Sequence, residues 1–170
     1  MVWQADRPTG LRVKPTAGPR NGERLELSDA AYCEQLQRPA TRFEKMTGQR
    51  MRAIFRAPGG RTSPRLLAAA QRCGWQHVPW TPNGFLGDEL DSTRYPNSAL
   101  LEQALQRVRA GEILLMHLGI WSRQDPWAPA VLEPLIVGLK SRGFCFETLR
   151  QHPTFGAAGP APREGHALAR

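Results

Sequence analysis

Apolar residues recur at helical spacing in four stretches of the chain, and short apolar runs separate these stretches. The first stretch predicts a helix from Ser28 to Thr47, because Ser28 is a suitable N-cap and Gly48 a suitable end. Pro39 falls inside this pattern, so we expect a kink or a split near Gln35. The same signals predict three further helices, over residues 63–73, 98–110 and 128–141.

Four apolar runs between and after these helices predict strands. The clearest spans Glu112 to His117, where four consecutive apolar residues are typical of a strand covered on both faces in a parallel sheet. The other predicted strands are residues 51–55, 75–80 and 144–149. Helices and strands alternate along the chain, which indicates an α/β fold with parallel strands.

Composition sets the expected domain limits. Residues 1–27 are rich in Pro, Gly and Arg without an apolar period, so they are predicted to form a disordered basic arm. Residues 151–170 are rich in Pro, Gly and Ala and are predicted to be a disordered tail. The folded region is therefore expected over residues 28–150, with one long loop at 81–97.

The charge balance raises nucleic acid as a partner. The chain has 170 residues, a formal net charge of +8 and a pI of about 10.4. Its arginines are spread over the whole sequence, however, and no helix carries a basic stripe. We therefore expect no specific nucleic-acid binding; a basic nucleic-acid-associated protein remains an alternative, which a steep salt dependence of binding would reveal.

The sequence shows no sign of export or membrane insertion. No apolar run is long enough to cross a bilayer, and the first residues lack the apolar core of a signal peptide, so a cytoplasmic location is expected for the chain as written. Cys33, Cys73 and Cys145 are widely spaced and odd in number. They are predicted to be buried free thiols rather than a disulfide framework.

Candidate chemistry lies where predicted strands end. Arg56 and His117 each follow a strand, and Asp88 lies in the loop after the strand ending at Trp80. Each residue alone also fits a structural role: a surface arginine, a loop-capping aspartate or a satisfied histidine. Parallel strands bring their carboxyl ends to one rim, so the three together favour an acid/base site, with Trp80 and Trp121 as neighbours.

Three motifs at these positions are similar to those of a known family. Residues 55–60, Phe-Arg-Ala-Pro-Gly-Gly, resemble a motif built on an arginine and a proline, and Leu115-Met116-His117 resembles a Leu-x-His motif. Between them, residues 84–90 follow Trp80 where an Asp-x-x-Asp-Trp motif belongs, although that pattern itself is absent. Over residues 28–150 the chain thus resembles the polysaccharide deacetylases with a NodB homology domain, carbohydrate esterase family 4.

The resemblance implies a distorted (β/α) barrel that removes acetyl groups from N-acetylated polysaccharides or oligosaccharides with the help of a divalent metal such as zinc. By resemblance, His117 would be the general acid, Arg56 would orient the base, and Asp88 would stand in the fourth motif. Leu115 would line the acetyl pocket. The other expected substrate contacts are Pro58, Trp80 and Trp121.

The chain departs from the family in its first two motifs, which supply the metal ligands and the base. No histidine precedes His77, no His-x-x-x-His pair occurs, and His77 is expected to point away from the rim. The chain therefore resembles the carboxyl-terminal part of such a domain, a partial barrel without its amino-terminal strands. We expect it to bind no metal and to be inactive alone, whether through a mistaken start, a frameshift or a truncated gene. A non-catalytic carbohydrate-binding or interaction protein on the same scaffold remains the alternative.

Overall fold

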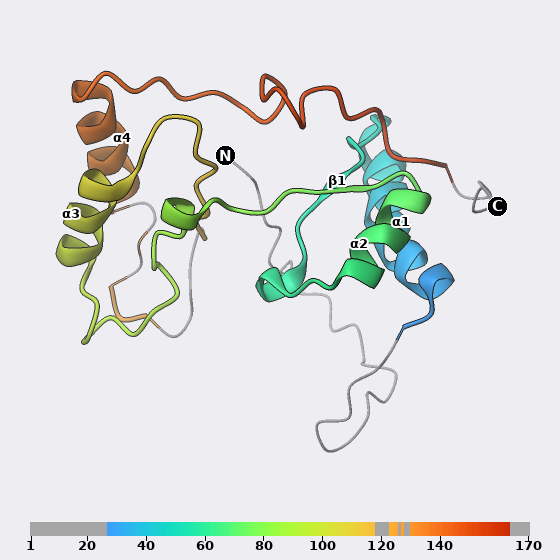
Figure 1. Cartoon of the computed structure of the whole chain (residues 1–170), viewed down its shortest axis with the longest axis horizontal. Helices are drawn as coiled ribbons and strands as arrows, with labels where there is room; N and C mark the ends of the chain where they lie inside the picture. Colours follow the sequence, from blue (N-terminus) through green and yellow to red (C-terminus); the bar gives the residue numbers. More distant parts are fainter. Residues whose placement is uncertain (1–26, 118–122, 126, 128–129, 164–170) are drawn as a thin grey trace, which may run out of the picture. The chain divides into compact units, whose positions relative to one another are not determined.

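The structure is a computed structural model that describes residues 27–117, 123–125, 127 and 130–163. Within these residues, two α-helices alternate with two very short strands, and two further α-helices follow (Figure 1). The chain divides into two units, which are described one at a time. The discontinuous unit comprises the described residues 27–78 and 157–163, and the central unit comprises those of 79–156.

Helix α1, Asp29–Thr47, begins the discontinuous unit. The Ser28 hydroxyl caps it by accepting a hydrogen bond from the backbone N–H of Ala31 at 3.2 Å. Gly48 ends it with a φ of 70°, a left-handed conformation that glycine adopts without strain. Pro39 lies inside α1 without splitting it, because the apolar face of the helix packs against the rest of the unit on both sides of the proline.

A strand–helix–strand arrangement follows α1. Strand β1 (Ile54–Phe55) pairs in parallel with β2 (Gln76–His77), with Phe55 opposite His77. Between them run the short 3₁₀ turn η1 (Pro58–Gly60) and helix α2 (Pro64–Arg72). Both strands were predicted, and they are parallel as expected, but each contributes only two residues to the sheet.

The core of the discontinuous unit is small and rich in alanine. Small side chains let α1, α2 and the strands approach closely, so that the larger apolar side chains can close around them. Its buried members are Ala40, Ala53, Ala70, Trp75 and Ala161, and Tyr32, Leu36, Met51, Phe55 and Cys73 pack against them.

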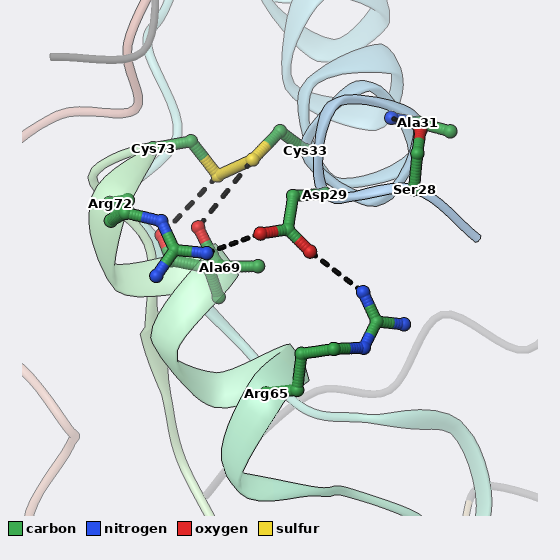
Figure 2. Close-up of a disulfide and its surroundings, with 9 residues drawn as sticks. Ser28, Asp29, Ala31, Cys33, Arg65, Ala69, Arg72 and Cys73 are labelled. Atoms are coloured by element: carbon green, nitrogen blue, oxygen red, sulfur yellow. Dashed lines mark hydrogen bonds and ion pairs between the residues drawn. A yellow bond between two sulfur atoms is a disulfide. The ribbon is translucent and has the colours of Figure 1, made fainter. Parts of the chain in front are cut away.

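The prediction of three buried free thiols is wrong. Cys33 of α1 and Cys73, at the end of α2, form a disulfide with a Cα–Cα distance of 6.1 Å (Figure 2), a spacing that a disulfide accommodates. Cys145 is free, but it is exposed. The disulfide could not be predicted from the sequence, because its cysteines are 40 positions apart and meet only through helix packing.

An ionic contact joins the same two helices beside the disulfide. Asp29, in the first turn of α1, lies between two arginines of α2 (Figure 2). Its Oδ1 is 2.7 Å from Nη1 of Arg65, and its Oδ2 pairs with Nη2 of Arg72. All three side chains are partly exposed, so each pair contributes little by itself. The negative charge also suits the positive end of the α1 dipole.

Residues 157–163 return to the discontinuous unit. Arg52 and Pro160 form an antiparallel bridge. The N–H of Ala53 donates to Gly159 O at 2.8 Å, and the N–H of Ala161 donates to Met51 O at 2.7 Å. Composition predicted disorder here; backbone pairing to a strand edge needs few apolar side chains, and composition therefore does not reveal it.

The central unit contains the turn η2 (Pro82–Gly84) and helices α3 (Asn97–Arg107) and α4 (Leu132–Ser141). The two helices pack side by side (Figure 1). Their inward faces and the segments before and after them form one apolar core. Its buried members are Leu86, Leu100, Ala104, Val108, Trp127, Val131, Leu135 and Leu139.

Two extended segments of the central unit run parallel. Phe85 forms a parallel bridge with Leu115, whose N–H donates to Gly84 O at 2.8 Å. The strand predicted at 112–117 is thus paired at this one point. The strand predicted at 144–149 is wrong, because these residues form no strand; Phe144 instead packs against the core, and Phe146 is 46% exposed.

The described residues therefore have an α/β fold with a parallel two-stranded sheet and four α-helices, and within them no barrel is formed. The predicted disorder of residues 1–26 and of the tail beyond residue 163 stays a prediction, because residues 1–26 and 164–170 lie outside the described part. Over the same described part, none of the helices has the length and apolar character that crossing a bilayer requires.

Candidate functional site

A tight turn positions two consecutive carboxylates in the central unit. The N–H of Leu90 donates to Gly87 O at 2.9 Å, which closes a turn with Asp88 and Glu89 at its centre. Gly87 has a φ of 76°, and a side-chain carbon there would lie 2.8 Å from Cδ2 of Leu100. The turn is therefore held against α3 at a position that only glycine suits.

Asp88 and His117 form a buried pair. The backbone N–H of His117 donates to Asp88 Oδ2 at 2.5 Å, and the ring Nδ1 of His117 lies 3.1 Å from Asp88 Oδ1. Asp88 is 0% exposed and His117 9% exposed. The two residues lie just beyond the bridge between Phe85 and Leu115, at the carboxyl ends of the parallel segments.

This double contact sets what the imidazole can do. An ionised Asp88 accepts hydrogen bonds only, so the ring nitrogen facing it, Nδ1, carries a proton. Proton exchange with other groups is thereby directed to Nε2, which lies 3.9 Å from Glu89 Oε2. Glu89 is about half exposed, unlike Asp88. The arrangement is suited to giving or taking one proton at Nε2.

Two other predicted site residues, Trp80 and Leu115, lie in the central unit. Trp80 is half-buried, and its ring centroid is 6.3 Å from that of Phe85. Phe85 in turn is bridged to Leu115, which is 3% exposed. Trp80 and Leu115 thus belong to the same paired segments as Asp88 and His117.

The remaining predicted residues lie outside the described part of the central unit. Arg56 directly follows β1, and Pro58 is exposed at the start of η1, so both belong to the discontinuous unit. That they share a rim with His117 stays a prediction. Trp121 lies outside the described residues.

The expectation for His77 rests on a strand that is longer than the real one. His77 is the last residue of β2 and lies opposite Phe55, with ring centroids 5.2 Å apart. Burial, and next the positive charge of Arg56, lower the pKa of His77. His77 and Arg56 therefore interact electrostatically at the same end of the strand pair, contrary to the prediction that His77 points away.

Acidification should destabilise the protein through His77. Its folded-state pKa lies below the ordinary value of 6.5, so the unfolded chain binds the proton more tightly. The contribution of His77 to the free energy of unfolding is fully present above pH 6.5. It decreases as the pH falls through that value and levels off below the folded-state pKa. Urea midpoints between pH 7.5 and 5 test this: His77→Gln should flatten the profile and Gln76→Ala should not. An unchanged profile in His77→Gln would contradict it.

Sequence reasoning missed a buried arginine. The Arg123 side chain is 0% exposed, and it donates hydrogen bonds to Leu90 O at 2.5 Å and Tyr95 O at 3.0 Å. No periodic pattern marks it. The only signal was the length of the loop at 81–97, whose carbonyl groups needed donors from elsewhere in the chain.

A separate cavity of about 800 Å³ lies in the central unit, between α4, the segment 108–116 and the residues after α4. Its lining is mostly apolar and includes Leu114 and Met116. Neither Asp88 nor His117 borders it. Within the described part of the chain, no three His, Cys, Asp or Glu side chains are grouped so that they could hold a metal ion.

The fold has counterparts among solved structures. One is the wild-type BA3943 from Bacillus anthracis, described as a CE4 family pseudoenzyme, at 23% sequence identity and a TM-score of 0.54. A mutant of the same pseudoenzyme matches with the same identity and TM-score. The match covers 69% of this chain and 38% of BA3943, so this chain corresponds to well under half of that protein.

Comparisons by sequence give no match. No protein-family model matches this chain, and no curated protein does. At 23% identity the likeness to BA3943 concerns the fold alone. The described α/β fold is accordingly similar to part of a CE4 family structure.

Proposed function

We propose that this chain is a homologue of the polysaccharide deacetylases, in which Asp88 and His117 form the acid part of a deacetylase-type site. The proposed substrate class is an N-acetylated polysaccharide or oligosaccharide. His117 would give a proton from Nε2 to the leaving amine, and Asp88 would hold the ring in the required orientation.

One observation carries this proposal: the fully buried carboxylate of Asp88 contacts both the backbone N–H and the ring Nδ1 of His117. A histidine needed only for packing requires one polar partner. The backbone contact holds the carboxylate in place, and the ring contact orients the imidazole and selects its tautomer, as proton transfer requires. The likeness of fold to a CE4 family structure is consistent with this role.

The other sequence predictions enter the proposal with the roles that the family resemblance gave them. Leu115 and Trp80 would contact the acetyl group and the sugar from the paired segments of the central unit. Pro58 and Trp121 are proposed as further substrate contacts. Arg56 would orient the general base, and the proposal names no described residue as that base.

A divalent metal is part of the family chemistry, but the described residues do not fit one. They include no group of three possible metal ligands, and the donors beside His117 are two carboxylates of one turn, one of them already engaged by the histidine. No step of the proposed chemistry is therefore routed through a metal. For the same reason we propose that the chain by itself does not turn over substrate.

The expected result is no measurable acetate release from N-acetylglucosamine oligomers, with or without added zinc. Without a metal or a base, amide hydrolysis loses several powers of ten in rate. A coupled acetate assay on the full chain, with His117→Ala as the matched control, checks this. Zinc-dependent release that disappears in His117→Ala would show that the chain is a complete catalyst and would overturn the proposed lack of turnover.

The second candidate is a non-catalytic carbohydrate-binding protein on the same scaffold. It is favoured by the description of BA3943 as a pseudoenzyme.

Adding N-acetylglucosamine oligomers while following the imidazole signals of His117 by NMR tests whether a sugar reaches the pair. A saturable change that Asp88→Asn alters supports a sugar site at the pair. Saturable binding elsewhere, with unchanged His117 signals, would favour the binding protein and contradict the acid role.

A further inference from the structure

The contact between Asp88 and His117 depends on how the turn that carries Asp88 is held in place. This turn, Gly87–Leu90, belongs to the connection between η2 and α3, which contains no helix, and the Asp88 carboxylate must nevertheless stay within hydrogen-bond distance of His117. The first end of the turn is fixed by Gly87, which packs tightly on Leu100 of α3. The second end needs a separate restraint.

We propose that Arg123 is the positioning residue for the Asp88–His117 pair. Its Nη1 donates to Leu90 O at 2.5 Å, and Leu90 closes the turn that carries Asp88. This inference rests on the proposed function only in treating the pair as a site. The restraint itself is a matter of geometry and can be tested without a substrate.

The contacts of Arg123 extend from the end of the turn to the start of α3. Its Nη2 donates to Tyr95 O at 3.0 Å and to Asn97 Oδ1 at 3.0 Å. It also contacts Asp125 twice, from Nη2 to Oδ1 at 2.9 Å and from Nε to the backbone O at 3.3 Å. One planar guanidinium thus binds the loop just after the turn, the start of α3 and its own segment.

Burial makes this restraint stiff. A guanidinium with 0% exposed side-chain surface is stable only while its hydrogen bonds are satisfied, because it cannot be deprotonated and has no water to replace a lost acceptor. Moving Leu90 away would break a charge-assisted hydrogen bond inside the protein. The loop therefore keeps its shape, and Asp88 stays at His117.

Asp125 extends the same restraint to α3. Its Oδ2 accepts a hydrogen bond from the N–H of Asn97 at 3.2 Å, and its backbone O accepts one from Asn97 Nδ2 at 3.0 Å. Asp125 thus caps α3, on which Gly87 packs, and it also accepts hydrogen bonds from Arg123. Both ends of the turn are in this way connected through the contacts of the buried Arg123 and the partly exposed Asp125.

The experiment uses the full chain with Arg123→Met, Arg123→Lys and, as the matched control, Arg94→Met, an exposed arginine of the same loop. The readouts are hydrogen exchange of the His117 backbone N–H and the ¹⁵N signals of its ring, which report the tautomer. We expect exchange at least about tenfold faster and a mixed tautomer in Arg123→Met, and neither change in Arg94→Met.

Arg123→Lys decides the outcome if Arg123→Met does not fold. Lysine keeps the charge but cannot bind all these acceptors in one plane, so faster exchange and partial loss of the Nδ1–H tautomer are expected. Folded variants with the wild-type exchange rate and tautomer would overturn the inference. Failure of the proposed function would instead appear as unchanged His117 signals when sugar is added to the wild-type chain, so the two failures are distinguishable.

Discussion

Removing the Cys33–Cys73 disulfide should lower the free energy of unfolding of the discontinuous unit by about 4 kcal/mol. The bond closes a loop of 40 residues, and without it the unfolded chain gains the corresponding conformational freedom. The core of this unit is small and rich in alanine, so little other burial compensates. Urea unfolding of Cys33→Ser/Cys73→Ser, followed by tryptophan fluorescence, measures the effect.

The matched control is Cys145→Ser, which removes the exposed free thiol and should leave the urea midpoint unchanged. Treating the wild-type chain with a reductant should reproduce the double variant, while the double variant itself should not respond. The expected loss is a large fraction of the stability of a small unit. Equal midpoints for oxidised and reduced wild-type protein would show that the disulfide does not stabilise the unit.

Gly84→Ala should destabilise the central unit by about 3 kcal/mol and separate Asp88 from His117. A side-chain carbon at Gly84 would lie 2.0 Å from Ile113 O and 2.9 Å from its carbonyl carbon. Backbone atoms cannot move aside like a flexible side chain, so the two parallel segments must move apart. Because Asp88 and His117 are carried by those segments, their hydrogen bonds should be lost with the pairing.

Thermal unfolding measures the first effect, and hydrogen exchange of the His117 N–H measures the second. Gly159→Ala is the matched control, since nothing lies within 4 Å of a carbon added there. It should change neither readout. A Gly84→Ala protein with wild-type stability and a protected His117 N–H would mean that the segments do not pair as closely as the structure describes.

The sequence predicts helix ends well where they carry local signals, whereas α4 begins at Leu132 rather than at the predicted residue 128. Ser28 and Gly48 bound α1, and Ser63 with Pro64 starts α2, each through contacts within a few residues. The start of α3 is less local: Asp125, 28 positions away, binds the N–H of Asn97. A prediction from adjacent residues therefore places this helix start one residue late.

Strand pairing is not a local property, and there the sequence predicts less. Both 112–117 and 144–149 contain apolar residues that predict a strand, yet among the described residues only the first segment meets a partner. Asp88 and His117 were predicted as strand-end residues, and the structure places them in contact. Arg123 and the disulfide were missed because each depends on side chains brought together from distant positions.

The return of residues 157–163 to the strand edge has a consequence for protein synthesis. Arg50 and the residue whose carbonyl it binds, Ala161, are 111 positions apart, so the ribosome must make the whole central unit between them. At about 5–20 residues per second this takes on the order of 5–20 s. Throughout that interval the nascent chain carries an unpaired edge at Met51–Ala53 and a core without Ala161. The central unit can fold while it is being translated, but residues 51–53, which are made before it, are among the last to reach their final structure.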